Sequence, residues 1–387
     1  MAFDWINEKL ADLSAQGYRR QRVTVDVEKD GIISIDGRHY LHFASNDYLG
    51  MRHDEGLQQT WVEGIAQFGA GSGASPLVTG YTRAHSALES YLAEHLNREA
   101  ALLFNSGFAA NQAVLQALFA KSGNITSDKL MHASFIDGAM SSPAQFRRFA
   151  HNNPAHLTEL LSKIPSTNSL IATESVFSMD GDEAPLKALA DIASEHGSWL
   201  MVDDAHGFGV LGEKGLGCAE YVDLSQKDVP VLMGTFGKAV GTAGAFIAGS
   251  RELIALLINT ARHYIYSTAM PPAQALATLY SLEQLQDGRR QKMLSDNIRY
   301  FKTRMQNTDF RVTDSQTAIQ PILMDGPNQA MALSDALKQR GIWVPPIRYP
   351  TVPKGTDRLR VTLSSVHTHK DIDALCDALL LAREAIS

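Results

Sequence analysis

Short apolar segments alternate with segments of helical periodicity through the middle of this chain. Two of the helix-like segments are residues 86–97 and 185–197, and the first carries Leu88, Tyr91, Leu92 and Leu96 on one face. Strands that alternate with helices in this way pack as a mostly parallel sheet with helices on both faces. The sequence therefore predicts an α/β fold whose strands are the apolar runs of four to six residues at 101–104, 169–173, 199–203, 229–234 and 245–249.

The two ends of the chain have a different pattern. Residues 3–16 are amphipathic, and residues 23–44 alternate apolar and polar side chains around two Asp-Gly dipeptides, which favour tight hairpin turns. The last hundred residues contain two strand-like and two helix-like segments, the first helix being followed by Gly341, the residue typical just after a helix C-terminus. We expect three parts: a helix and β meander (1–45), a large α/β domain (46–282) and a small α+β domain (283–387).

Charge and cysteine content exclude several classes of protein. With 35 basic and 42 acidic residues, the net charge is −7, which does not favour nucleic acid or an anionic membrane as a partner. The only cysteines, Cys218 and Cys376, form no CxxC motif, so neither a disulfide framework nor a zinc site is expected. The first residues lack the apolar core of a secretory signal, and no apolar run reaches the roughly 18 residues of a membrane span. We expect a soluble cytoplasmic protein.

Polar side chains follow the predicted strands. Residues 105–111 lead from a strand into a helix, residues 174–182 and 203–209 begin with carboxylates, and residues 235–238 contain a threonine and a lysine. In open α/β sheets, ligands bind beyond the carboxyl ends of the strands. A carboxylate that ends an apolar strand is costly unless a cation or a hydrogen bond compensates it. These segments therefore predict one polar site at that edge.

Two glycine-rich segments do not fit nucleotide-binding motifs. The segment GTFGK at 234–238 superficially resembles a phosphate loop. However, Leu232 stands where the first glycine of that motif should be, and Ala239 stands where Ser or Thr should follow the lysine. The segment at 69–76 lacks the spacing of a dinucleotide fingerprint and follows a helix-like stretch rather than a strand.

A metal site is not expected either. Asp203 and Asp204 are adjacent in a strand, so their side chains point to opposite faces and do not converge with His206 on one ion. His367 and His369 precede the last predicted helix, where we expect solvent exposure.

The remaining combination suits pyridoxal 5′-phosphate (PLP). A lysine can hold the cofactor aldehyde as a Schiff base, and an aspartate can keep the pyridine nitrogen protonated so that the ring accepts electrons. Hydroxyl groups and the amides at a helix N-terminus can hold the phosphate.

The same segments resemble those of the α-oxoamine synthases, which are PLP enzymes of fold type I. The resemblance runs from about Arg19 to the C-terminal helix. It implies a large domain with a mostly parallel sheet of the seven-stranded type, a small C-terminal domain, an N-terminal arm and a homodimer with a shared active site. The motifs that carry it are VDDAHGFGVLGEKGLG, TFGKAVGTAGAF, ESVFSMDGD and SNDYLG.

The resemblance also implies roles for individual residues. Lys238 would form the Schiff base and act as acid and base at Cα, Asp203 would face the pyridine nitrogen, His206 the phenolic oxygen, and His132 would stack on the ring. The other cofactor contacts would be Gly107, Phe108, Ser178 and Thr235, with Ser267 and Thr268 coming from the partner subunit. The substrate contacts would be Arg20, Asn46, His132, Thr351 and Arg348, which would pair with the amino-acid carboxylate.

The implied reaction joins L-alanine to a pimeloyl thioester, carried by CoA or an acyl-carrier protein, with release of CO2 and free thiol in biotin biosynthesis. One alternative is a sister synthase that joins glycine to acetyl-CoA or succinyl-CoA, or serine to palmitoyl-CoA. A PLP transaminase or lyase would share the lysine and aspartate but would release no thiol. A scaffold without activity would have no reason to retain the lysine, aspartate and histidine together.

Overall fold

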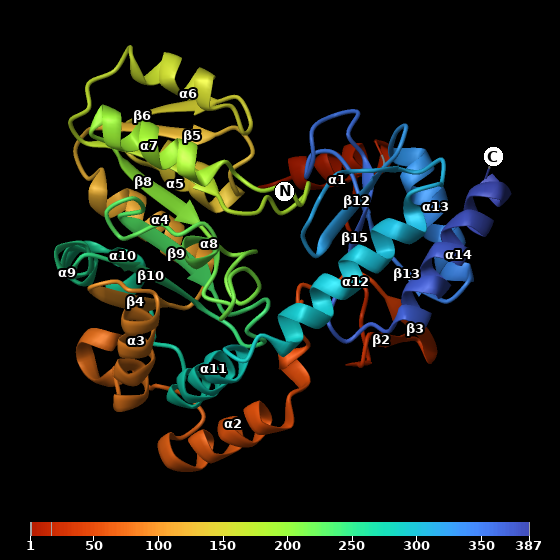
Figure 1. Cartoon of the computed structure of the whole chain (residues 1–387), viewed down its shortest axis with the longest axis horizontal. Helices are drawn as coiled ribbons and strands as arrows, with labels where there is room; N and C mark the ends of the chain where they lie inside the picture. The colour runs from red at the N-terminus through yellow and green to blue at the C-terminus, as the bar shows by residue number, and fades with distance from the viewer. Residues whose placement is uncertain (1, 17, 387) are drawn as a thin grey trace.

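The computed structural model describes residues 2–16 and 18–386. Residues 1 and 387, which are the first residue of the expected N-terminal part and the last residue of the expected C-terminal part, lie outside the described residues. Figure 1 shows a larger and a smaller body, with helix α12 running between them. The larger body contains a seven-stranded sheet in the order β4-β10-β9-β8-β7-β5-β6. Its strands are β4 (Ala100–Phe104), β5 (Asn124–Asp128), β6 (Gln145–Phe149), β7 (Ser169–Glu174), β8 (Trp199–Asp203), β9 (Val231–Thr235) and β10 (Ala245–Gly249).

The sheet is mostly parallel, as predicted. Strands β5 to β9 pair in parallel, whereas β10 is antiparallel to both of its neighbours, β4 and β9. All five apolar segments form strands at about the expected positions. Strands β5 and β6 are additional. The sequence of β5, NITSD, is mostly polar although all five of its residues are buried, and β6, QFRRF, is a partly exposed edge strand.

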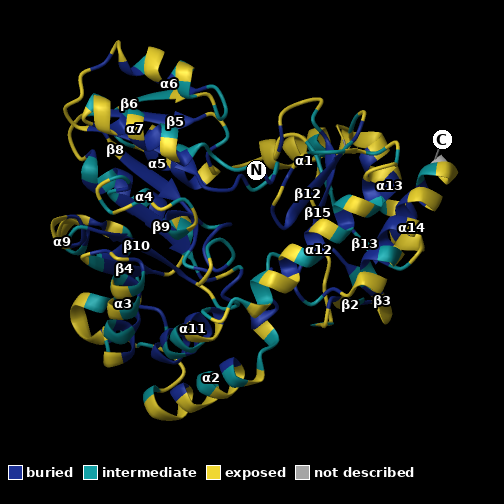
Figure 2. Cartoon of the chain, viewed as in Figure 1, coloured by how far each residue is buried: buried dark blue, intermediate teal, exposed yellow. Residues whose placement is uncertain are grey.

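Alternate residues of the strands enter two separate apolar cores. Leu103, Val202 and Leu232 lie in one cluster, while Leu102 and Met201 lie in the other. Because successive strand residues point to opposite faces, a sheet covered on both sides needs continuous apolar runs. Figure 2 shows the buried strands between helices whose outer faces are exposed. The flanking helices are α3 (Arg83–His95), α6 (Pro154–Leu161), α7 (Leu186–His196), α8 (Cys218–Tyr221) and α11 (Pro272–Leu285) with the first cluster, and α4 (Gly107–Leu118), α5 (Ala133–Ser141), α9 (Arg251–Thr260) and α10 (Arg262–Ile265) with the second.

The N-terminal part forms the predicted helix and meander. Asp30-Gly31 and Asp36-Gly37 all have positive φ angles, between 50° and 77°, which is the geometry of tight two-residue hairpin turns. A fourth strand that the sequence did not predict joins this sheet in parallel with β3, although it comes from the C-terminal part. The elements of this part are α1 (Trp5–Ala15), β1 (Val27–Lys29), β2 (Ile32–Ile35) and β3 (Arg38–His42), and the added strand is β13 (Ile342–Trp343). Along the chain, β3 is followed by three helices that precede the large sheet: η1 (Met51–His53), α2 (Glu55–Phe68) and η2 (Pro76–Gly80).

The C-terminal part forms a small antiparallel sheet in the order β11-β12-β15-β14, covered by helices. Both predicted strands and both predicted helices are present, and Gly341 has the expected left-handed conformation with a φ of 78°. We propose the same division of the chain at 45/46 and 282/283. The elements are α12 (Arg289–Met305), β11 (Arg311–Val312), β12 (Ile319–Leu323), α13 (Pro327–Gln339), β14 (Pro346–Ile347), β15 (Arg358–Thr362) and α14 (His369–Ile386).

The prediction of solvent exposure is wrong for His367 and correct for His369. His367 is buried because the turn before α14 folds against β3: its Nε2 atom lies 3.1 Å from the carbonyl oxygen of His42, and its ring packs on Phe43. His369 is exposed and stacks on Tyr300.

Within residues 2–16 and 18–386, none of the helices is both long and apolar enough to traverse a lipid bilayer.

Candidate active site

A cavity of about 560 Å³ lies beyond the carboxyl ends of the parallel strands, and both bodies contribute to its wall. Because β4, β5, β7, β8 and β9 all run in one direction, the polar segments that follow them meet at one edge. Six of the predicted site residues line the cavity: Asn46, His132, Ser178, His206, Lys238 and Thr351.

Lys238 lies in the tight loop that joins β9 to its antiparallel neighbour β10. Backbone hydrogen bonds close this loop, among them one from Gly241 N to the carbonyl oxygen of Lys238 at 2.9 Å. Burial lowers the pKa of the lysine amine to about 8, although the nearby carboxylates of Asp203 and Glu174 favour its charged form. The amine is therefore more often neutral near physiological pH than an ordinary lysine.

Asp203 ends β8 and is buried. Its Oδ2 accepts a hydrogen bond from the side-chain amide of Asn111 at 2.8 Å, and its Oδ1 accepts one from Ala205 N at 3.1 Å. Asp204 points to the other side, where Ser175 Oγ and Cys218 N donate to it at 2.5 and 2.8 Å. The two carboxylates diverge as predicted, and in the described part of the chain no group of three or more His, Cys, Asp or Glu residues could hold a metal ion.

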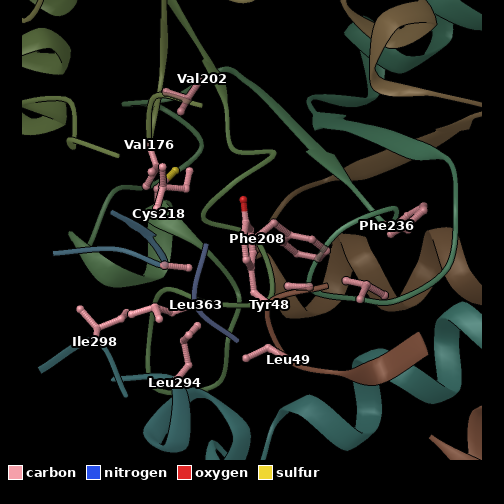
Figure 3. Packing of buried hydrophobic residues seen from close by; sticks show 14 of the residues in the cluster. Tyr48, Leu49, Val176, Val202, Phe208, Cys218, Phe236, Leu294, Ile298 and Leu363 are labelled. Carbon is pink, nitrogen blue, oxygen red and sulfur yellow. The ribbon is translucent and has the colours of Figure 1, made fainter. Parts of the chain in front are cut away.

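His206 is tied to the loop that carries Asn46. Tyr48 Oη lies 2.6 Å from His206 Nδ1 and 3.3 Å from Asn46 Oδ1, so one phenol connects the two residues. Burial lowers the pKa of His206 well below its usual value, and the charge of Lys238 lowers it further. Figure 3 shows Tyr48 in the apolar cluster that also contains Phe208, which follows the His206 turn. The role of Tyr48 was not predicted, although it lies in the SNDYLG segment.

Some predicted cofactor contacts lie at the same edge but outside the wall of the cavity. Gly107 and Phe108 are the first two residues of α4, where backbone amides have no intrahelical partner. Ser106 caps this helix by accepting a hydrogen bond from Ala109 N at 3.2 Å. The hydroxyl of Thr235 donates to the carbonyl oxygen of Gly244 at 2.8 Å, within the loop that carries Lys238.

Ser267 and Thr268 are not brought to Lys238 within the chain. They line a separate small cavity, and the side-chain amide of Asn105 donates to the carbonyl oxygen of Thr268 at 2.7 Å.

Neither Arg20 nor Arg348 is part of the wall of the Lys238 cavity. Arg20 is exposed and donates to Thr351 Oγ1 at 3.0 Å, which brings the N-terminal segment to the cavity. Arg348 is not part of the cavity wall, and its Nη1 lies 2.9 Å from the sulfur of Met331.

Arg360 of β15 lines the cavity and was not predicted. Its Nε donates to the carbonyl oxygen of Ser178 at 2.6 Å and its Nη1 to Asn46 Oδ1 at 3.2 Å, so it connects the small body to two segments of the site. A buried arginine is rare unless it is paired or functional, and an arginine in the middle of the apolar strand RLRVT was the available signal.

This fold and this site define a class of protein. A mostly parallel seven-stranded sheet with a lysine, an aspartate and a histidine at its carboxyl edge is the architecture of the fold type I PLP transferases. The family model described as aminotransferase class I and II matches residues 38–379. The chain belongs to this family and, within it, to the family of 8-amino-7-oxononanoate synthases.

Curated relatives support the assignment to the 8-amino-7-oxononanoate synthases. An 8-amino-7-oxononanoate synthase from Pseudomonas entomophila is 47% identical over 380 residues, covering 98% of this chain and 97% of the relative. One from Vibrio campbellii is 46% identical over 383 residues, covering 98% of each.

Solved structures agree on the fold. Serine palmitoyltransferase from Sphingomonas wittichii has a TM-score of 0.93 and 29% identity, covering 99% of this chain and 98% of that one. Serine palmitoyltransferase from S. paucimobilis, solved with bound PLP and myriocin, also has a TM-score of 0.93, with 27% identity and coverage of 100% and 98%. An 8-amino-7-oxononanoate synthase from Francisella tularensis has a TM-score of 0.78 and 32% identity, covering 89% of this chain and 98% of that one.

Proposed function

We propose that this enzyme condenses L-alanine with a pimeloyl thioester and releases 8-amino-7-oxononanoate, CO2 and a free thiol, with PLP as its cofactor. One observation carries the proposal: Lys238 lines a substrate-sized cavity, near enough to the buried carboxylate of Asp203 to feel its charge, in a chain of the 8-amino-7-oxononanoate synthase family.

The residues at the sheet edge fit PLP. The amine of Lys238 is the one lysine amine in the wall of the cavity, within the described residues, and suits covalent attachment of an aldehyde. Asp203 supplies a buried carboxylate whose hydrogen bonds come from neutral donors. When bound, the cofactor supplies an electron sink for the bond changes at the α-carbon of the amino acid.

The positions of the protein groups support the following roles. Lys238 attaches the cofactor, then accepts and returns the proton at the α-carbon of alanine. Asp203 would keep the ring nitrogen of the cofactor protonated, and His206 would face its phenolic oxygen. His132 would pack on the ring, and the first amides of α4 would hold the phosphate. The polar contacts proposed around the cofactor are Gly107, Phe108, Ser178 and Thr235.

The substrate carboxylate is proposed to lie between Asn46 and the arginines of the small body. Arg348 was predicted for this role, but Arg360 is better placed because it lines the cavity and bonds to Asn46. Arg20 and Thr351 lie together at the rim, where the acyl thioester would enter.

A substrate panel tests the proposed function. L-alanine, glycine and L-serine would each be combined with the pimeloyl, acetyl, succinyl and palmitoyl thioesters of CoA, and with pimeloyl-acyl-carrier protein. Thiol release is expected to be at least about tenfold faster with alanine and a pimeloyl thioester than with any other pair. Faster turnover of glycine with acetyl-CoA, or amino transfer without thiol release, would contradict it.

The pKa of Lys238 predicts how cofactor uptake depends on pH. Only the neutral amine attacks an aldehyde, so capture of PLP by cofactor-free protein is expected to accelerate with pH and level off above the amine pKa of about 8. At pH 7 the rate should be roughly a tenth of its plateau value. The visible absorbance of the bound cofactor follows the reaction. A rate that still climbs tenfold per pH unit near about pH 10 would indicate an ordinary lysine.

We also propose a homodimer whose two active sites are shared. Ser267 and Thr268 do not line the Lys238 cavity of their own chain, which fits donation to the cofactor phosphate of a partner subunit. Large apolar side chains are exposed around this loop and at the start of α4, as expected for a surface that a second copy covers. They are Leu77, Val78, Tyr81, Phe108 and Tyr266.

Subunit mixing tests the shared site. Lys238→Ala subunits and subunits carrying Ser267→Ala with Thr268→Ala should each be nearly inactive. An equimolar mixture should recover up to about a quarter of wild-type activity under random exchange, because about half of the dimers are hybrids and one of the two sites in each hybrid combines the intact lysine with the intact hydroxyls. Hybrids no more active than their parents, with exchange confirmed by mass spectrometry, would exclude the shared site.

A further inference from the structure

Asn111 and Ser134 lie behind the pocket and connect two of its functional side chains. We propose that they are positioning residues that hold His132 as the neutral tautomer whose proton is on Nε2, ready to donate a hydrogen bond to a substrate oxygen. The significance of this arrangement for catalysis rests on the proposed function, whereas the tautomer itself can be measured independently.

The two residues are held rigidly. Asn111 is in α4 and Ser134 is in the first turn of α5, and their exposed fractions are 1% and 0%. His132 is the N-cap residue of α5 and lines the cavity. Hydrogen bonds between such groups keep their partners because no solvent competes for them.

The backbone N–H of Ser134 fixes the direction of the hydrogen bonds at His132, because a backbone N–H can only donate. The backbone N–H of Ser134 points to Nδ1 of His132 at 3.3 Å, so Nδ1 must be an acceptor without a proton. The proton of the neutral imidazole is therefore on Nε2.

The hydroxyl of Ser134 strengthens this assignment. Ser134 Oγ lies 2.8 Å from Nδ1 of His132 and accepts a hydrogen bond from the side-chain amide of Asn111 at 3.0 Å. Because an amide nitrogen only donates, the single hydroxyl proton is left to point at Nδ1.

Asp203 sets the orientation of the Asn111 amide. The same nitrogen donates to Oδ2 of Asp203 at 2.8 Å, so both of its N–H groups are used. A flipped amide would place its oxygen against the Asp203 carboxylate and would be repelled. Asn111 Oδ1 is buried and has no hydrogen-bond partner among the described residues. The two hydrogen bonds donated by Nδ2 therefore offset the free-energy cost of leaving this acceptor unsatisfied.

The arrangement links the two functional groups through one path. The carboxylate of Asp203 orients Asn111, Asn111 orients the hydroxyl of Ser134, and that hydroxyl holds Nδ1 of His132 in its unprotonated form. His132 is therefore a hydrogen-bond donor toward the pocket through Nε2 and not a base.

Nitrogen-15 NMR of histidine-labelled enzyme, with and without PLP, tests the tautomer. His132→Asn identifies the signals of this ring among the 13 histidines. A pyrrole-type signal at Nε2 and a pyridine-type signal at Nδ1 are expected in both forms. Proton occupancy on Nδ1 in the wild-type enzyme would overturn the proposal, whatever the activity.

Two variants test the roles of the positioning residues. Ser134→Ala should shift the two nitrogen-15 signals of the His132 ring toward those of a mixture of tautomers and lower kcat by about tenfold, with the KM for alanine nearly unchanged. Ser134→Thr keeps the hydroxyl and should restore the wild-type signals. If Ser134→Ala does not fold, Asn111→Ser removes the link to Asp203 and should show the same shift.

Ser198→Ala is the matched control. Ser198 is also buried, and its hydroxyl bonds to Ser169 at 2.8 Å at the opposite edge of the sheet, so His132 should be unaffected. Wild-type signals and a wild-type pH profile in both Ser134→Ala and Asn111→Ser would overturn the positioning role. Expected signals in a protein without synthase activity would instead contradict the proposed function and leave the tautomer assignment standing.

Discussion

Lys238→Ala is expected to reduce synthase turnover by at least about a thousandfold, because the covalent attachment and the group that moves the α-proton are lost together. The fold should persist, since the loop between β9 and β10 is closed by backbone hydrogen bonds. The variant should bind PLP without a covalent link. Absorbance spectra and peptide mapping after borohydride reduction measure this directly.

Lys129→Ala is a suitable control for Lys238→Ala. Lys129 follows β5 at the same edge of the sheet but is exposed, so its loss should leave turnover within about twofold. A borohydride-stable adduct on any lysine other than Lys238 would contradict the assignment.

Asp203→Asn is expected to slow exchange of the α-proton of alanine by about a hundredfold or more, because an amide cannot hold a proton on the ring nitrogen by charge. The exchange can be followed by NMR in D2O without an acyl donor. This separates the effect from thioester binding.

Asp204→Asn is the neighbouring control. Burial raises the pKa of Asp204 to about 7, so this carboxyl is partly neutral already, and its partners Ser175 and Cys218 lie away from the cavity. Exchange in this variant should stay within about threefold of wild type. Near-normal exchange in Asp203→Asn would contradict the role of Asp203.

Apolar pattern was sufficient to predict most of the large sheet. Five of the buried strands, β4, β7, β8, β9 and β10, coincide with apolar runs in the sequence. Strand β5 has no such run, and its buried Asp128 pairs with His151, a residue distant in sequence. The pairing of β13 with β3 could not be predicted either, because a strand of two residues is too short to show an alternating or apolar pattern.

The candidate site was predictable where side chains directly follow strands, and less so elsewhere. Lys238, Asp203 and His206 are delivered by β8 and β9, so the parallel order of the strands brings them together. Arg360 enters from the small body, and its position depends on how that body packs against the sheet edge. Asn111 lies on a helix behind the pocket, and a helical pattern alone gives no sign of the carboxylate that it contacts.

A turnover with alanine labelled at its carboxyl carbon tests the central claim most directly. Decarboxylative condensation at this site predicts that each mole of thiol released from pimeloyl-CoA is accompanied by one mole of labelled CO2 and one of unlabelled 8-amino-7-oxononanoate. Thiol release without labelled CO2, or a product that retains the labelled carboxyl, would contradict the account.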